Sequence, residues 1–137
     1  MSNIVVCHGR LHKRLTFPSH HHVDVSSDSK PDTVEELYTF MERVRPQTVD
    51  ELVFAYCPTY VYGDPKFSSL LDKIKLGGRI VVYGPPLESK INISKVAPAT
   101  IVIFKSLLEN ALKKSRIHFD VIVNSSQPYV SLVRRSG

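Results

Sequence analysis

Residues 71–86 read LDKIKLGGRIVVYGPP, in which apolar residues at helical spacing lead into Gly77-Gly78 and then into a wholly apolar segment. Asp64 is placed to cap the helix, and Pro65 suits its first turn. We expect the glycine pair to end the helix and a buried strand to begin at Ile80. Because a strand that is apolar on both faces needs cover on both sides, this stretch predicts a late αβ unit of a parallel sheet.

The size and composition of the chain predict one domain, residues 1–137, with 42% hydrophobic residues and two cysteines. Cys7 and Cys57 both lie in or beside apolar runs, which favours reduced thiols in an intracellular, cytoplasmic protein. No apolar run approaches the roughly 20 residues that cross a membrane, so we expect a soluble protein. The net charge of +5 favours polyanionic partners such as nucleic acid, but is also common on solvated surfaces.

The order of the predicted elements indicates an α/β fold. Strands are expected at 3–7, 21–25, 49–57, 80–83, 118–123 and 129–135, and helices at 32–46, from 64 to the glycine pair, and at 101–116. The segment from His8 to His20 shows no sustained helical period, which predicts an abbreviated first crossover. The last link is too short for a parallel crossover, so the last two strands are expected to form an antiparallel hairpin.

A mainly parallel sheet closed by such a hairpin resembles the Rossmann-like fold of class I S-adenosylmethionine-dependent methyltransferases. HVDVSSDSKPDTVEEL (22–37) looks like the end of the second strand in small members, TVDELVFAYC (48–57) is similar to their fourth strand, and LLDKIKLGGRIVVYGPP (70–86) to the helix and fifth strand that follow. The resemblance covers roughly residues 3–135. The small size suggests a minimal or viral-type version by analogy.

The resemblance implies cofactor contacts for three acidic residues. Asp24 would accept hydrogen bonds from the ribose hydroxyls of S-adenosylmethionine, since a carboxylate offers two acceptor oxygens to a vicinal diol. The alternative is an Asp that only starts a turn. Asp32 or Glu36 falls near the family's contact to the adenine amino group, and for each the alternative is helix capping or solvation.

The glycine-rich loop of the family corresponds here to VVCHGRLHKR (5–14), in which only Gly9 remains. Gly9 would still allow one close backbone approach to the cofactor, but His8 and Arg10 beside it would tend to fill that space. Arg10, Lys13 and Arg14 also concentrate positive charge beside the predicted carboxyl edge, where they would contact an anionic substrate.

Residues 57–60 read Cys-Pro-Thr-Tyr, similar in layout to the Asp/Asn-Pro-Pro-Tyr motif of amino-methylating members. By this match Cys57 would lie at the cofactor, and Pro58 and Tyr60 would face the substrate. Cys57 is a weak hydrogen-bond acceptor and replaces the family's amide or carboxylate poorly. The Tyr60 ring would either stack on a substrate base or pack over the proline.

The run His20, His21 and His22 suggests a metal site, but successive strand residues point to opposite faces, so at most His20 and His22 share a side. No carboxylate or cysteine falls at a familiar ligand spacing, and we predict no metal. No nucleophile elbow supports hydrolase chemistry either.

Two functions remain open. The first is an S-adenosylmethionine-dependent methyltransferase-like protein whose acceptor is unknown, with nucleic acid as one candidate. The second is a catalytically inactive binding or regulatory subunit of the same fold, which contacts RNA or a partner protein. The missing glycines favour the second, and the retained Asp24 favours the first.

Overall fold

The computed structural model describes residues 3–6, 17, 19–27, 30–55, 57, 59–83, 93–124 and 128–136. The strands are β1 (Asn3–Val6), β2 (His21–Asp24), β3 (Thr33–Val34), β4 (Val49–Ala55), β5 (Ile74–Tyr83), β6 (His118–Val123) and β7 (Val130–Ser136). The helices are α2 (Leu37–Glu42), α3 (Thr59–Tyr62), the 3₁₀ helix η2 (Pro65–Lys73) and α4 (Ile93–Lys114).

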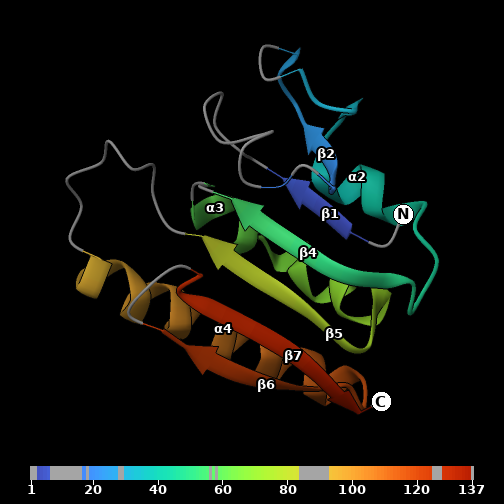
Figure 1. The fold of residues 1–137 in the computed structure, drawn as a ribbon. Helices are drawn as coiled ribbons and strands as arrows, with labels where there is room; N and C mark the ends of the chain where they lie inside the picture. Colours follow the sequence, from blue (N-terminus) through green and yellow to red (C-terminus); the bar gives the residue numbers. More distant parts are fainter. Residues whose placement is uncertain are drawn as a thin grey trace.

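Seven strands of the described residues form one sheet in the order β3-β2-β1-β4-β5-β7-β6 (Figure 1). All pairings from β3 to β5 are parallel, and β7 is antiparallel to both β5 and β6. The predicted fold class is confirmed: the sheet is mainly parallel and ends in an antiparallel hairpin. Only β7 is reversed, because β6, the outer strand, runs in the direction of β5.

The described helices lie on one face of the sheet, behind it in Figure 1. Phe67 of η2 and Phe104 of α4 are fully buried there, with their ring centroids 5.0 Å apart, and Met41 of α2 joins the same core. On the second face, the aromatic rings of Phe17 and Tyr83 pack together over a smaller cluster formed by β1, β4 and β5. The predicted abbreviated crossover, 8–20, lies mostly outside the described residues.

The helix expected to begin at Asp32 begins at Leu37 instead. Thr33 and Val34 form the short strand β3, which pairs with β2 and which the sequence analysis missed. Two strand residues are too few to show an alternating pattern, so this error has a simple cause. The N-cap of α2 is Glu36, whose carboxylate accepts hydrogen bonds from the amides of Tyr38 and Thr39.

The glycine pair does not end a helix, so the predicted end of the second helix is wrong. Asp64 caps η2 and Pro65 opens it, as predicted, but the helix stops at Lys73 and β5 begins at Ile74. Gly77-Gly78 lies within β5 where the pairing with β4 slips, from Val49 opposite Ile74 to Glu51 opposite Arg79. The extra residues on β5 therefore form a bulge. Gly77 has φ +82°, the left-handed region that favours glycine.

The third helix is longer than predicted, since α4 begins at Ile93 and includes Pro98. Phe104, Leu108 and Ala111 face the core, whereas Leu112 is 45% exposed. No described helix is long and apolar enough to cross a membrane.

The reversed strand β7 is fastened to the turn between η2 and β5 by Arg134. This side chain is 2% exposed, and its Nη1 donates to the carbonyl oxygens of Ile74 at 2.6 Å, Asp72 at 3.3 Å and Leu71 at 3.4 Å. The Leu71 and Asp72 carbonyl oxygens also accept from the backbone amides of Ile74 and Gln47. The guanidinium therefore adds a buried donor at the helix end, and its own charge is bonded to backbone acceptors.

Substitution of Gly78 by Ala is expected to destabilise the fold by about 1–3 kcal/mol. A Cβ there would lie 2.9 Å from the carbonyl oxygens of Lys75 and Val49, which are backbone atoms and cannot move aside cheaply. Gly77→Asn is the matched control, because nothing lies within 4 Å of its Cβ and Asn tolerates a left-handed backbone. Urea denaturation measures both; an equal loss of stability in the two variants would contradict the bulge packing.

Replacement of Arg134 by Met is expected to cost at least about 1–3 kcal/mol of folding free energy, because the helix-end carbonyl groups lose a buried donor. Arg135→Met is the control: its guanidinium pairs with the solvent-exposed Asp120, so its loss changes stability much less. Equilibrium denaturation compares the two. If both variants unfold at the same denaturant concentration, the proposed role of Arg134 is wrong.

Candidate functional site

The strand register brings the carboxyl ends of three strands together. Val6, the last residue of β1, is paired with Val23 of β2 and with Phe54 of β4. The chain leaves β1 toward β2 on one side, while β4 lies on the other, so this is the point where the strand order reverses. Open α/β sheets bind ligands in the crevice at such a point.

A cavity of about 370 Å³ lies at this edge. Its walls come from the ends of β1 and β2, the start of α2, and the segment from α3 to η2: Val6, Val23, Asp24, Val25, Glu35, Glu36, Leu37, Tyr38, Tyr60, Val61 and Asp64. The volume is near the lower end of the roughly 300–1,000 Å³ typical of ligand sites. It suits a nucleoside-sized group better than a large substrate.

Asp24 is the last residue of β2 and lines the cavity. Its Oδ1 accepts a hydrogen bond from the Ser26 amide at 3.2 Å, and its backbone carbonyl accepts one from the Glu35 amide at 2.9 Å. Both interpretations of the sequence are therefore compatible with its position: the carboxylate helps to form the turn, and the residue also lines the cavity.

The cavity has an acidic lining, although the chain as a whole is basic. Glu36 lines it, but each of its carboxylate oxygens accepts an amide hydrogen bond at the start of α2. Glu35 is bound by both terminal nitrogens of Arg43, at 2.5 and 2.6 Å, and this pairing lowers the pKa of Glu35. Asp64 accepts from the Lys66 amide. The ion pair with Arg43 offsets the charge of Glu35, so the acidic character of the lining comes from Asp24, Glu36 and Asp64, and it favours a ligand with a positive charge nearby.

Two tyrosines form the opposite wall. The Tyr38 hydroxyl donates to the Val61 carbonyl oxygen at 2.6 Å, which ties α2 to α3. The side chain of Tyr60 is 77% exposed at the same cavity, so its ring is available to a ligand that enters.

Two predicted contacts lie elsewhere. Oδ2 of Asp32 accepts from the His22 backbone amide at 2.8 Å, and Asp32 is not among the described residues that line the cavity. The half-buried Cys57 packs on the core, where its Sγ donates to the Val6 carbonyl oxygen at 3.4 Å. Gly9, Arg10, Lys13, Arg14 and Pro58 are outside the described residues.

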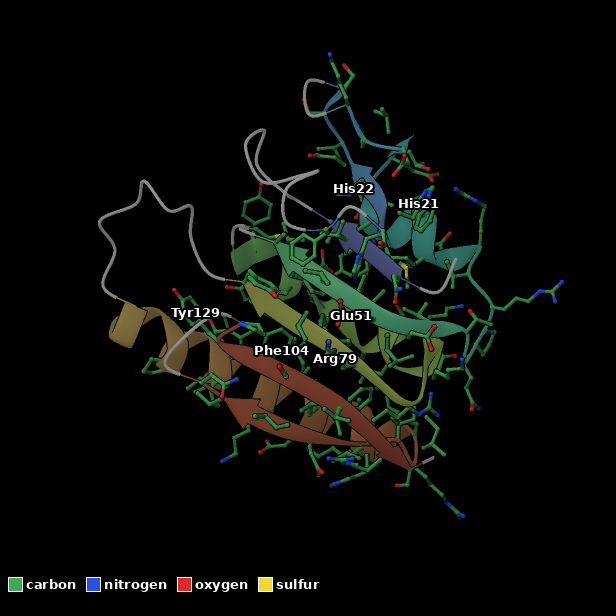
Figure 2. The ribbon with its side chains drawn as sticks, viewed as in Figure 1. His21, His22, Glu51, Arg79, Phe104 and Tyr129 are labelled. Carbon is green, nitrogen blue, oxygen red and sulfur yellow. The ribbon has the colours of Figure 1, made fainter. Side chains whose placement is uncertain are left out.

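The histidine run is divided between the two faces of the sheet, as its alternation predicts. The His21 ring stacks on Phe40 of α2, whereas His22 is buried on the second face with its Nε2 hydrogen-bonded to the Phe17 carbonyl oxygen at 2.8 Å. On that second face Glu51 pairs with His20 at 2.7 Å and with Arg79 at 2.5 Å (Figure 2). No cluster of three metal-ligating side chains occurs within the described ranges.

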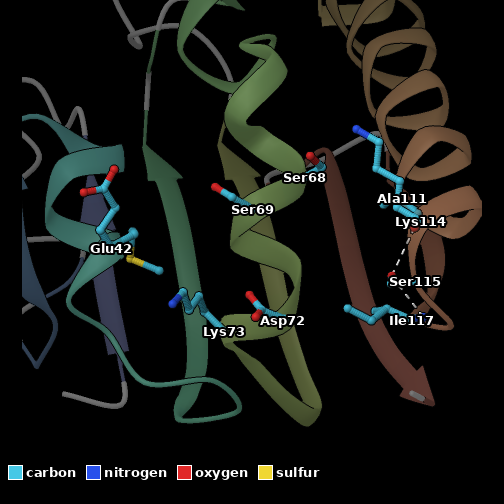
Figure 3. Close-up of a pocket in the computed structure, with 10 residues that line it drawn as sticks. Glu42, Ser68, Ser69, Asp72, Lys73, Ala111, Lys114, Ser115 and Ile117 are labelled. Atoms are coloured by element: carbon cyan, nitrogen blue, oxygen red, sulfur yellow. Dashed lines mark hydrogen bonds between the residues drawn. The ribbon is translucent and has the colours of Figure 1, made fainter.

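A second hollow, of about 480 Å³, lies on the helical face between α2, η2 and α4 (Figure 3). Three of its polar groups are bonded within the fold: the Ser69 hydroxyl donates to the Lys66 carbonyl oxygen, the Ser115 hydroxyl to that of Ala111, and the Lys73 amine to that of Val44. The carboxyl-edge cavity is the better candidate site, because it lies where the strand order reverses and open α/β sheets bind ligands.

The cavity contains residues to which the sequence analysis gave no binding role, such as Glu35, Tyr38 and Asp64. Tyr38 has the spacing of a core residue, and Asp64 that of a helix cap, and both roles are real. Glu35 directly follows β3, so recognition of that strand would have drawn attention to it.

No protein-family model matches the chain, and the search of curated proteins finds no match. Among solved structures, the fold is similar to a protein from Sulfolobus solfataricus that is provisionally assigned as a type 11 methyltransferase, with a TM-score of 0.52 and 14% identity. The alignment covers 99% of this chain and 86% of that one. At this identity the likeness concerns the fold alone: the chain has a methyltransferase-like Rossmann fold.

Proposed function

We propose that the chain binds S-adenosylmethionine at its carboxyl edge as a methyltransferase-like protein. The observation that carries this proposal is the position of Asp24, at the end of β2 and in the wall of a cavity at the strand-order reversal. A carboxylate at this point can accept hydrogen bonds from both hydroxyls of a ribose.

The rest of the cavity fits the parts of this cofactor. Val6, Val23 and Leu37 supply an apolar wall for the adenine ring, and the acidic lining complements the positive sulfonium group. When bound, S-adenosylmethionine would supply an electrophilic methyl group. The exposed Tyr60 ring would then lie on the side from which an acceptor approaches.

The acceptor class follows less directly, because the cavity is acidic. A nucleic acid would have to approach over positive charge, and Arg10, Lys13 and Arg14 are the residues proposed for that role. Arg134 adds no exposed positive charge for such an approach, because it is buried and bonded to backbone carbonyl groups. A partner protein is the other binding partner that we propose.

A second function is favoured because two of the predicted cofactor contacts are hydrogen-bonded to backbone amides of the protein itself. Both carboxylate oxygens of Glu36 hold the start of α2, and Asp32 holds the backbone of β2. If the adenine contact has been lost in this way, the same fold would serve as a catalytically inactive binding or regulatory subunit.

Calorimetric titration with S-adenosylmethionine and S-adenosylhomocysteine separates the two functions. Asp24→Asn keeps the Oδ1 acceptor for Ser26 but removes the charge, and loss of a charge-assisted hydrogen bond, about 1.5–3 kcal/mol, corresponds to roughly 10- to 150-fold weaker binding. Asp72→Asn, on the helical face, is the matched control and should bind like wild type.

The proposal fails if the folded wild-type chain binds neither ligand, and that result supports the inactive subunit. Binding that is unchanged in Asp24→Asn would also contradict the proposed site. Circular dichroism melting of each variant shows whether it is folded during the titration.

A further inference from the structure

The outer strand β6 has one backbone edge that pairs with no other described strand, because the sheet order ends β7-β6. Amide and carbonyl groups along such an edge are a template for pairing with a further strand. Natural proteins usually protect these edges with charges, bulges or covering elements.

Protection is present only in the first half of β6. A register shift separates His118 from Phe119, and the Asp120 carboxylate binds both Arg135 and His118. These two hydrogen bonds lower the pKa of Asp120, so it carries a negative charge at neutral pH.

The second half is aliphatic and exposed. Val121, Ile122 and Val123 are 40%, 42% and 46% exposed, although they are consecutive residues of a strand. Leu112 of α4 is 45% exposed, one helical turn beyond the buried Leu108, on a helix that contacts β6. Val121 and Val123 lie on one face of the strand and Ile122 on the other, so exposed aliphatic side chains flank the open edge on both faces, which indicates an interface.

This edge is complementary to itself. In an antiparallel pairing centred on Ile122, Ile122 lies opposite Ile122 of a second copy, and Val121 lies opposite Val123. Asp120 then faces the uncharged Asn124, and all three exposed aliphatic side chains meet aliphatic partners.

The two registers shifted toward Asp120 are worse. A pairing centred on Val121 places the Asp120 carboxylate opposite Ile122, and one centred on Asp120 places two carboxylates opposite each other. The Asp120 carboxylate therefore disfavours both of these registers relative to the one centred on Ile122.

We propose that the chain forms a two-fold symmetric dimer in which β6 pairs antiparallel with β6 of a second copy, centred on Ile122. The interface is at the opposite end of the sheet order from β2, so the carboxyl-edge cavity stays open in both subunits. The dimer does not depend on cofactor binding, and either proposal can fail without the other.

Sedimentation velocity of the full chain over a concentration series tests the dimer. Wild type should sediment at twice the chain mass of 15.5 kDa. Ile122→Lys should be monomeric, because it places two ammonium groups opposite each other at the two-fold axis. Val102→Lys is the matched control: Val102 is 67% exposed on α4, outside the proposed interface, and this variant should remain dimeric.

A monomeric wild type at every concentration overturns the proposal, as does a Val102→Lys variant that dissociates as fully as Ile122→Lys. Ile122→Cys is a milder second variant that tests the register. Opposed residues in an antiparallel pair have Cα atoms about 4.5–5.5 Å apart, within disulfide range.

Mild oxidation of Ile122→Cys should therefore join two chains through position 122, as peptide mapping would show, whereas Val102→Cys should give no such link. A disulfide from position 122 only to Cys57, or equal dimer yields from the two variants, would overturn the register.

Discussion

The pairing of β1 with two parallel neighbours is the constraint on which the site depends. Ile4, Val5 and Val6 are at most 1% exposed, and their backbone pairs with β2 on one side and β4 on the other. This register sets the ends of the three strands at one level. Asp24 then stands just beyond Val6, and the thiol of Cys57 reaches the Val6 carbonyl. Any change that shifted β1 by one residue would turn its side chains to the wrong faces and separate the walls of the cavity.

Several carboxylates in this chain stabilise the fold through hydrogen bonds and ion pairs. Glu36 caps a helix, Glu35 holds Arg43 and Asp32 holds a strand amide. On the second face of the sheet, Glu51 binds both His20 and Arg79. That face bears no helix among the described residues, and in this ionic group the Arg79 side chain is exposed whereas those of His20 and Glu51 are mostly buried. The sheet is thus apolar where helices cover it and charged over part of the other face.

The sequence predicted the elements that have a strong local pattern. The unbroken apolarity of Leu52–Ala55 indicated a central strand, and Asp64-Pro65 indicated a helix start, and both are correct. The two residues of β3 are too few to show a strand pattern. Because β3 was not predicted, the helix was expected to begin at Asp32 instead of Leu37. Asp32 and Glu36 both precede this helix, and the sequence does not show which of the two carboxylates caps it. The choice depends on where the chain leaves the sheet.

The glycine pair illustrates a different limit. A glycine after apolar residues at helical spacing is typical of a helix end, yet here the spacing belongs to a 3₁₀ helix that stops earlier. The need for Gly78 arises from carbonyl groups of β4, which are distant in sequence. The cavity is unpredictable for the same reason, since four separate segments meet in it through strand register. Asp24, Glu36 and Tyr60 were identified by resemblance, and their convergence required the fold.

The insertion of β7 between β5 and β6 has a consequence for the route of folding. Both neighbours precede β7 in the chain, so neither can complete its hydrogen bonding until the final segment arrives. The sheet cannot assemble vectorially from one end of the sequence to the other. The pairing of β7 with β5 and β6 must be a late, long-range step. Until it occurs, a nascent chain would expose the unpaired edges of β5 and β6 that β7 later covers.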